Sequence, residues 1–413
     1  MQEEKKKGLE EMRLNRHDYY NSVTDQVKDL RTLAAVQADL CFDMNTLTQV
    51  LAPETAKQIQ RVIITGCGDS YSAAGAMLPG FRKLSGLRQC NSPDIMDFCS
   101  FYRREKVYKG LPAEQVLVIG ISFSGSSARV VEALEKANDL GVHSLLITRT
   151  PDSKGGHTAK HVFDVATPDG CNTPGLRSYY ASLMGLAALG AYLGVCSGVL
   201  KQDRFFQVKQ SIVEYTLAFM QNFDAVDELM FQEALRMKNL RKFELIADYN
   251  EGYSAQFVEQ KFIECGGVFC THTNSEEFVH ISFMARCPEE YGEIVMINGA
   301  DRSMSRMKDT INGCLAQHRP TLIVTDVAPD AFDLSVNEFA GTSPYFQAVQ
   351  GYDSMAQRGT PTFCQIPKAP EQWMSVFVDF LPGSLLAGYQ AAVNEARFFA
   401  GRYDFRTQTW LDR

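Results

Sequence analysis

Short apolar runs, each followed by a polar loop and a helix-like stretch, recur along the chain and restrict the folds open to it. The runs are apolar at most positions instead of alternating, which is typical of parallel strands covered on both faces. Strands that alternate with helices predict a doubly wound α/β architecture. Ten such runs can be identified, five in each half: 61–66, 88–92, 116–122, 142–148 and 161–167, then 243–249, 267–272, 293–299, 321–326 and 362–367. The sequence therefore predicts two similar, flavodoxin-like domains, each with a five-stranded parallel sheet.

The segments between the runs suggest the domain boundaries. Each half ends in a long apolar helix candidate, and the second half carries an insertion around residues 337–361 that the first half lacks. We predict an N-terminal helical segment packed against the first domain, a first domain, a helical connection and a second domain, with the bounds 1–57, 58–205, 206–240 and 241–413.

Composition and charge exclude several classes of protein. The chain has 413 residues, 45% of them hydrophobic, and a formal net charge of -8 with no basic cluster beyond Lys5–Lys7, which argues against a nucleic-acid partner. No apolar run is expected to reach the roughly 20 residues of a membrane span, and the charged N-terminus lacks the apolar core of a secretory signal. The eleven cysteines include no C-x-x-C pair and indicate reduced thiols. A cytoplasmic protein without membrane contact is expected.

Two polar loops follow the first and third apolar runs. They are "TGCGDSY" (65–71) and "ISFSGSS" (121–127). In an open parallel sheet, ligands bind beyond the carboxyl ends of the strands, where helix N-termini favour anions. The serines could equally be helix caps in solvated turns. Because the third glycine of a dinucleotide fingerprint and the Walker lysine are both missing, a small phosphorylated molecule suits these loops better than a nucleotide.

The two loops together resemble the SIS (sugar isomerase) domain, whose members carry G-x-G-[ST]-S and I-S-x-S-G-x-[ST] about 50 residues apart. The resemblance covers roughly residues 50–405 as two tandem SIS domains. This layout is shared by the isomerase half of glutamine–fructose-6-phosphate aminotransferase, by amino-sugar-phosphate deaminases and by fructosamine-6-phosphate deglycases. It implies that a sugar phosphate is held by Gly68, Ser70, Ser122, Ser124 and Ser127.

The loops also depart from the family pattern. Phe123 stands where many members have glutamine. The counterparts in the second half, "DYNEGYS" (248–254) and "NGADRSMS" (298–305), have lost most of the pattern. The second domain is therefore expected to bind no phosphate.

Residues 254–283 contain the candidates for the chemistry. Lys261 and Glu264 are three positions apart on a predicted helix and so share a face, although such a pair is usually a solvated ion pair. His280 follows Glu264 by 16 residues, the spacing found in tandem SIS enzymes. The resemblance implies that Glu264 moves a proton between C1 and C2, that His280 aids ring opening or acts as the acid, and that Lys261 assists the glutamate. It also implies that His280 comes from the neighbouring subunit of a homodimer with shared active sites. The family has Gly-Pro after this histidine, whereas here Ile281–Ser282 follows.

Other polar residues near these motifs receive smaller roles. Arg177 lies on a loop that covers the sugar in the family, so it is a candidate substrate-binding residue. His272 is expected to be structural. Glu276 and Glu277 are expected to be exposed charges at a helix start, although either could meet an amine of the substrate. No His/Cys cluster has metal-ligand spacing, so neither a metal nor a cofactor is expected.

The sequence thus predicts an enzyme that hydrolyses a fructosamine 6-phosphate to an aldose 6-phosphate and a free amine. Three features speak against the aminotransferase: no glutaminase domain precedes the SIS pair, Gln2 and not cysteine follows Met1, and the C-terminal "GRYDFRTQTWLDR" (401–413) lacks the Schiff-base lysine. The alternatives are an aldose–ketose isomerase, an amino-sugar-phosphate deaminase, and a non-catalytic sugar-phosphate sensor.

Overall fold

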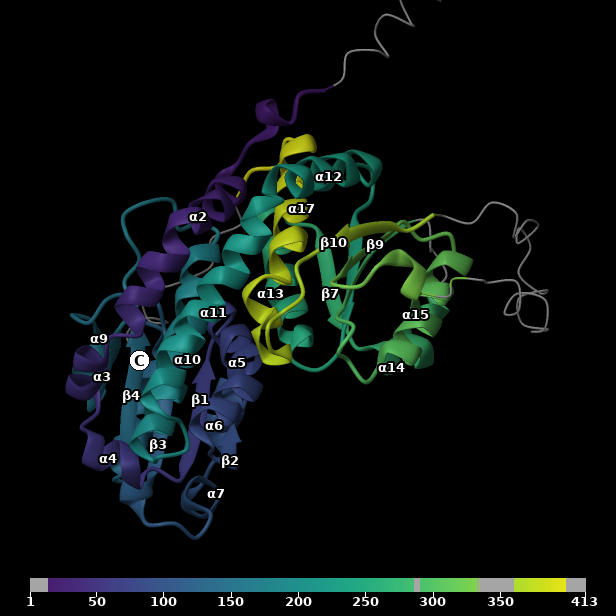
Figure 1. Ribbon diagram of the computed structural model, residues 1–413. Coiled ribbons are helices and arrows are strands. Elements are labelled where there is room, and N and C mark those ends of the chain that lie inside the picture. The colour runs from purple at the N-terminus through teal and green to yellow at the C-terminus, as the bar shows by residue number, and fades with distance from the viewer. Residues whose placement is uncertain (1–13, 286–289, 333, 335–359, 399–413) are drawn as a thin grey trace, which may run out of the picture.

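A computed structural model describes residues 14–285, 290–332, 334 and 360–398 of the chain (Figure 1). These residues contain two five-stranded parallel sheets, one from each half of the sequence. All ten predicted strands are present, with bounds within about three residues of those expected. The predicted α/β class and the two doubly wound sheets are therefore confirmed.

The first sheet has the strand order β2-β1-β3-β4-β5. Its strands are β1 (Arg61–Gly66), β2 (Gln89–Asn91), β3 (Val116–Ile121), β4 (His143–Thr148) and β5 (His161–Asp164). β1 and β3 are buried at every position because helices cover both faces of the sheet. One face packs against α5 (Asp69–Ser85) and α10 (Leu176–Cys196), and the other against α6 (Ile95–Phe101), α7 (Arg104–Tyr108) and α8 (Ala128–Asp139). The short α9 (Lys154–Thr158) precedes β5.

The second sheet repeats this order as β10-β9-β8-β6-β7. Its strands are β6 (Lys242–Ala247), β7 (Phe269–Thr273), β8 (Tyr291–Ile297), β9 (Thr321–Thr325) and β10 (Thr362–Gln365). α12 (Phe223–Arg236), α13 (Glu251–Gly266) and α17 (Phe380–Val393) join the large core on one face, while α14 (Ser275–His280) and α15 (Met304–Ala316) cover the other. β6 and β8 thus correspond to β1 and β3, the neighbouring strands at which the connections change direction.

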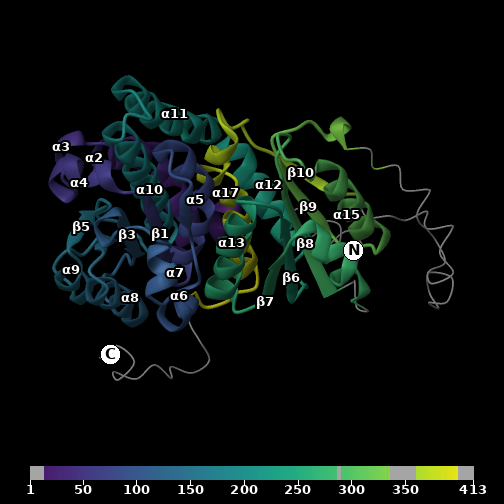
Figure 2. The ribbon, with the colours of Figure 1, turned by 90° about the horizontal axis from the view of Figure 1, so that it is seen from below.

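Helices from both halves form the layer between the two sheets (Figure 2). α13 of the second half packs directly on α5 of the first half. Gly75 permits this contact, since a Cβ atom at that position would lie 2.2 Å from the ring of Tyr253. Tyr179 of α10 stacks on Phe257 of α13 with ring centroids 3.8 Å apart. One continuous core therefore joins the two halves and fixes α13 against the first domain.

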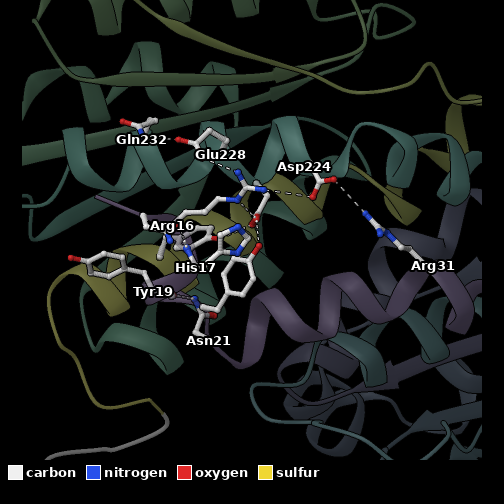
Figure 3. A network of polar contacts seen from close by, with 12 residues as sticks. Arg16, His17, Tyr19, Asn21, Arg31, Asp224, Glu228 and Gln232 are labelled. Atoms are coloured by element: carbon white, nitrogen blue, oxygen red, sulfur yellow. Dashed lines mark hydrogen bonds and ion pairs between the residues drawn. The ribbon is translucent and has the colours of Figure 1, made fainter. Parts of the chain in front are cut away.

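The N-terminal segment contributes α2 (Ser22–Cys41), α3 (Met44–Val50) and α4 (Pro53–Gln58). α2 begins at Asn21, whose side chain accepts hydrogen bonds from two backbone N–H groups, and it packs on α10, α17 and α11 (Gln202–Gln221). Just before α2, the Arg16 guanidinium donates to Asp227 at 3.0 Å and to Glu228 at 2.9 Å (Figure 3). Tyr389 of α17 donates to the same buried Asp227 at 2.7 Å. The segment packs on α10 of the first half and is also bonded to α12 and packed on α17. The predicted domain boundaries stay predictions.

Two helical segments correct an expectation about apolar runs. α10 and Gln372–Val393 are long and apolar enough, by length and composition, to cross a membrane, so the expectation that no run approaches that length is wrong. Within the fold, 89% and 94% of their most apolar stretches are buried. A helix that is surrounded by other elements is apolar on all sides, and such a core helix passes the same test. The two helices are weak evidence for a membrane span.

Several sequence features lie outside the described residues. They are Gln2, Lys5–Lys7, the C-terminal stretch 401–413 and nearly all of the insertion at 337–361.

Candidate active site

The two polar loops of the first half meet at the carboxyl ends of two neighbouring strands of the first sheet. They follow β1 and β3, which pair in parallel with Gly66 opposite Ile121. Gly68 has a φ of +54° and leads directly into α5, whose first turn contains Ser70. Gly125 has a φ of +66°, and a Cβ atom there would lie 2.0 Å from the Ser153 hydroxyl oxygen. Both glycines therefore have backbone conformations that would be strained in a residue with a side chain.

The serine hydroxyls of the second loop are not engaged as simple helix caps. Ser127 is the N-cap residue of α8, yet its side chain makes no capping hydrogen bond. The buried Ser122 donates instead to the Ser127 hydroxyl at 3.1 Å. Ser124 is exposed, and its hydroxyl accepts only a local bond from the Ser126 N–H at 3.3 Å. The loop thus presents hydroxyls next to the N-terminus of α8, an arrangement suited to an anion. The substrate-binding roles predicted for Gly68, Ser70, Ser122, Ser124 and Ser127 stay predictions.

Lys261 and Glu264 of α13 reach the same end of the first sheet. As predicted, they share a helix face, and the Lys261 Nζ atom lies 2.5 Å from Glu264 Oε2. The same ammonium lies 2.8 Å from Oδ2 of Asp69, the first residue of α5. The Lys261 side chain is fully buried, whereas both carboxylates are partly exposed. One buried ammonium therefore links the first loop to the candidate base.

Burial and charge act in opposite directions on this trio. Burial lowers the pKa of Lys261, but the carboxylates of Asp69 and Glu264 raise it, and its net pKa lies above the usual value. Burial raises the pKa of Glu264, and the nearby ammonium of Lys261 lowers it again, with a net shift upward. Glu264 is thus a stronger base than an ordinary glutamate, while Lys261 stays charged beside it.

Asp69 was not singled out by the sequence analysis. Its contact with Lys261 joins residues 192 positions apart, which no local pattern reveals. A signal was nevertheless present, because Asp69 stands at the [ST] position of the G-x-G-[ST]-S pattern that the first loop resembles.

His280 lies apart from this trio. It is the last residue of α14, its side chain is 71% exposed, and its ring nitrogen lies 3.6 Å from Glu276 on the same helix. No polar contact between the described residues links His280 to Glu264 or Lys261. The remaining polar residues behave as expected: Glu276 and Glu277 are exposed in the first turn of α14, and His272 is paired with Glu259.

Arg177 was expected on a loop, but it is the second residue of α10, and its side chain is bonded to the loop before that helix. The buried guanidinium donates to the carbonyl of Pro168 at 2.7 Å and lies 3.5 Å from the carboxylate of Asp29. These contacts hold the loop before α10 against α2. The substrate-binding role predicted for Arg177 stays a prediction.

The corresponding end of the second sheet contains a cavity of about 620 Å³. Its lining combines acidic, basic and hydroxyl side chains: Asp248, Glu276 and Asp309, Arg302 and Arg306, and Ser303 and Ser305 among others. Arg306 is already paired with Glu276 at 2.8 Å and Asp309 at 3.2 Å. The lining of the cavity therefore carries both negative and positive charges. Among the described residues, no group of three or more His, Cys, Asp or Glu could hold a metal ion.

Comparison with known proteins gives a family match that includes the second polar loop, residues 121–127. The profile of the SIS domain matches residues 105–192. Glutamine–fructose-6-phosphate aminotransferase [isomerizing] of Streptococcus agalactiae serotype V is 24% identical over 219 residues, which are 52% of this chain and 35% of that protein. The match thus spans about a third of the length of this relative.

Solved structures show the same two-sheet fold. The C-terminal domain of glucosamine-fructose-6-phosphate aminotransferase from Francisella tularensis has a TM-score of 0.73 at 14% identity and covers 94% of this chain and 100% of its own. Tagatose-6-phosphate ketose/aldose isomerase from Escherichia coli has a TM-score of 0.62 at 12% identity and covers 92% of this chain and 97% of its own. Residues 105–192 therefore match the SIS domain, and the two sheets of the chain share the fold of these solved structures.

Proposed function

We propose that this chain is an enzyme that hydrolyses a fructosamine 6-phosphate to an aldose 6-phosphate and a free amine. The observation that supports this most directly is the trio at the end of the first sheet. A buried Lys261 joins the Glu264 carboxylate to Asp69 of the first polar loop. The second polar loop, which follows the adjacent strand, has hydroxyls and a helix N-terminus that suit a phosphate. A base placed beside a phosphate site can act on the carbons of a phosphorylated sugar.

The reaction needs proton transfers and water only. In the open-chain substrate, C2 is a carbonyl and C1 carries the amine. Glu264 removes a proton from C1 while an acid, proposed to be His280, protonates the C2 oxygen, which gives the enaminol. Return of a proton to C2 produces an imine between C1 and the nitrogen. Water adds to C1 and the C–N bond breaks, so that the aldose 6-phosphate and the amine leave.

Lys261 serves this scheme as a positioning residue. Its ammonium keeps the partly exposed Glu264 ionised and fixes the direction of the carboxylate, while the remaining exposed surface of Glu264 stays open to a substrate. Because Lys261 itself is fully buried, it acts through Glu264 and not by contact with the sugar.

His280 reaches the reaction only if a second copy of the chain supplies it. We propose a homodimer with shared active sites, and the residues around His280 support it. Ile281 and Met284, one and four residues after His280, expose 65% and 64% of their surface. Large apolar side chains exposed together beside a candidate acid are what a subunit interface would cover. Assembly would bury them and bring His280 to the partner's Glu264.

An aldose–ketose isomerase is the second candidate, since it requires the same transfer of a proton between C1 and C2. The fold shared with tagatose-6-phosphate ketose/aldose isomerase favours it. A deaminase or a non-catalytic sensor would use the same phosphate loops.

The test is turnover of a panel of fructosamine 6-phosphates, ketose 6-phosphates and amino-sugar 6-phosphates in deuterated water. We expect release of amine from the fructosamine phosphates, with deuterium at C2 of the aldose product. Interconversion of ketose and aldose phosphates without amine release would establish the isomerase instead. Tight binding of sugar phosphates with no turnover of any of them would establish a sensor.

A further inference from the structure

Asp69 places a negative charge where the related loop pattern has a hydroxyl. The pattern G-x-G-[ST]-S has serine or threonine at this position, and this chain has "GCGDS". Lys261 offsets only part of the charge, because its single ammonium faces the carboxylates of both Asp69 and Glu264. The trio therefore keeps a net negative charge and favours a cationic group on whatever binds there.

The two carboxylate oxygens of Asp69 have different surroundings. Oδ2 accepts a hydrogen bond from Lys261 at 2.8 Å. The loop before α10 also approaches Oδ2 closely, since a Cβ atom at Gly175 would lie 3.0 Å from it. Oδ1 is buried and accepts no hydrogen bond from any residue that the structure describes. No hydrogen-bond donor among the described residues therefore offsets the negative charge on this oxygen.

The position of Asp69 fits the chemistry of an amine-bearing substrate. Asp69 and Glu264 are bonded to the same ammonium, so their carboxylates lie close together. In a fructosamine phosphate, the carbon from which Glu264 takes a proton is bonded directly to the nitrogen. A substrate that presents C1 to Glu264 therefore has its amine next to the base and near a second carboxylate.

We propose that Asp69 is the specificity-determining residue for the substrate amine, and that its negative charge, which Lys261 only partly offsets, favours the protonated nitrogen on C1. This proposal rests on the proposed function, and it names the group that distinguishes a fructosamine phosphate from a plain ketose phosphate. A ketose phosphate offers a neutral hydroxyl at C1, which lacks the attraction between opposite charges that a protonated amine has for a carboxylate.

The experiment compares two ligands that differ only at C1, 1-amino-1-deoxyfructose 6-phosphate and fructose 6-phosphate, by equilibrium binding near pH 7. The wild type should prefer the amine. Asp69→Ser, which restores the family's residue, should reduce this preference about ten- to a hundredfold and leave the affinity for fructose 6-phosphate nearly unchanged. Asp97→Ser is the matched control, because Asp97 is an exposed first-turn aspartate of α6. It should keep the wild-type preference.

Two results overturn the proposal. Equal affinity of the wild type for both ligands would show that Asp69 does not recognise the amine. Equal losses for both ligands in Asp69→Ser would show that Asp69 only positions Lys261. If Asp69→Ser does not fold by circular dichroism, Asp69→Asn keeps the shape and removes the charge, and its ligand preference decides in the same way.

The binding data also separate this proposal from the proposed function. If the wild type releases no amine but prefers the amine ligand through Asp69, the role of Asp69 is supported and the proposed deglycase activity is contradicted. If the wild type releases amine but shows no preference between the two ligands, the deglycase activity is supported and the role of Asp69 is contradicted.

Discussion

At the scale of single residues, the chemistry depends on an uneven balance of charge. Lys261 is fully buried and has two carboxylate partners, so it stays protonated despite its burial. Glu264 has one cationic partner, which it shares with Asp69, and its pKa is raised. A base needs a proton affinity above that of a free carboxylate and must still be ionised at the working pH. The trio meets both needs with three side chains from two helices.

Replacing Glu264 tests this balance directly. Glu264→Gln keeps the size of the side chain and removes the base, so kcat should fall by about 10²–10⁴-fold with a modest change in KM. Glu259→Gln on the same helix, where Glu259 pairs with His272, is the control and should retain activity. In the wild type, the acid limb of the kcat–pH profile should lie above the ordinary glutamate value of 4.5, since the pKa of Glu264 is raised. Retention of full activity by Glu264→Gln would remove it as the base.

At the scale of elements, most of the fold could be predicted because parallel strands buried on both faces are apolar at nearly every position. β1 and β3 are fully buried, and the sequence shows them as unbroken runs. The i, i+3 spacing likewise placed Lys261 and Glu264 on one face. Asp69 could not be assigned, because its contact depends on how α13 packs against α5 across 192 residues of sequence. α10 has an apolar stretch as long as a membrane span, contrary to expectation, because other elements surround this helix on every side.

The loops after β3 and β8 allow a paired test of the phosphate site. Ser124→Ala removes a hydroxyl from the first-half loop, and loss of a hydrogen bond to a charged group costs about 1.5–3 kcal/mol, or roughly ten- to a hundredfold in affinity for a sugar phosphate. Ser305→Ala is the matched change, because Ser305 is also exposed and follows the equivalent strand of the second sheet. It should have little effect. Equal losses measured by calorimetry in the two variants would contradict the assignment to the first half.

The first residue of α13 should make stability depend on pH. Burial and the nearby Asp301 raise the pKa of Glu251 to about 7, although Ser375 and Asn298 lower it by donating hydrogen bonds to its carboxylate. The folded chain therefore binds this proton more tightly than the unfolded chain. Stability should fall as the pH rises from about 4.5 to about 7 and change little above that on account of this group.

Glu251→Gln should reduce that loss. The shift corresponds to about 3 kcal/mol in the free energy of unfolding for Glu251 alone. Asp301 and Asp379 also have raised pKa values, so a part of the slope should persist. Urea denaturation at pH 5 and pH 8 measures the difference, with the exposed Glu135→Gln as control. An unchanged difference between the two pH values in Glu251→Gln would contradict the role of this carboxyl.

At the scale of the whole molecule, the two halves have different parts in the proposed reaction. The continuous core fixes α13, and with it Glu264, against α5 of the first half of the same chain. His280 stands on the outer face of the second sheet's helical cover, exposed and without a polar contact to that site among the described residues. In the proposed homodimer, the proton donor for the C2 oxygen comes from another copy, and the apolar Ile281 and Met284 near His280 give that copy a surface to cover.

Mixed dimers provide the test of this arrangement. Glu264→Gln and His280→Ala chains, each inactive alone, should recover activity when they are unfolded together, refolded and allowed to pair at random. Each mixed dimer would hold one site with both residues intact and one site with neither, so a random mixture of two-fold dimers should regain about a quarter of the wild-type activity. Refolding each variant separately and mixing without exchange is the control and should regain none. If His280 acted within its own chain, no pairing could restore an intact site, and the mixture would stay inactive whatever its oligomeric state.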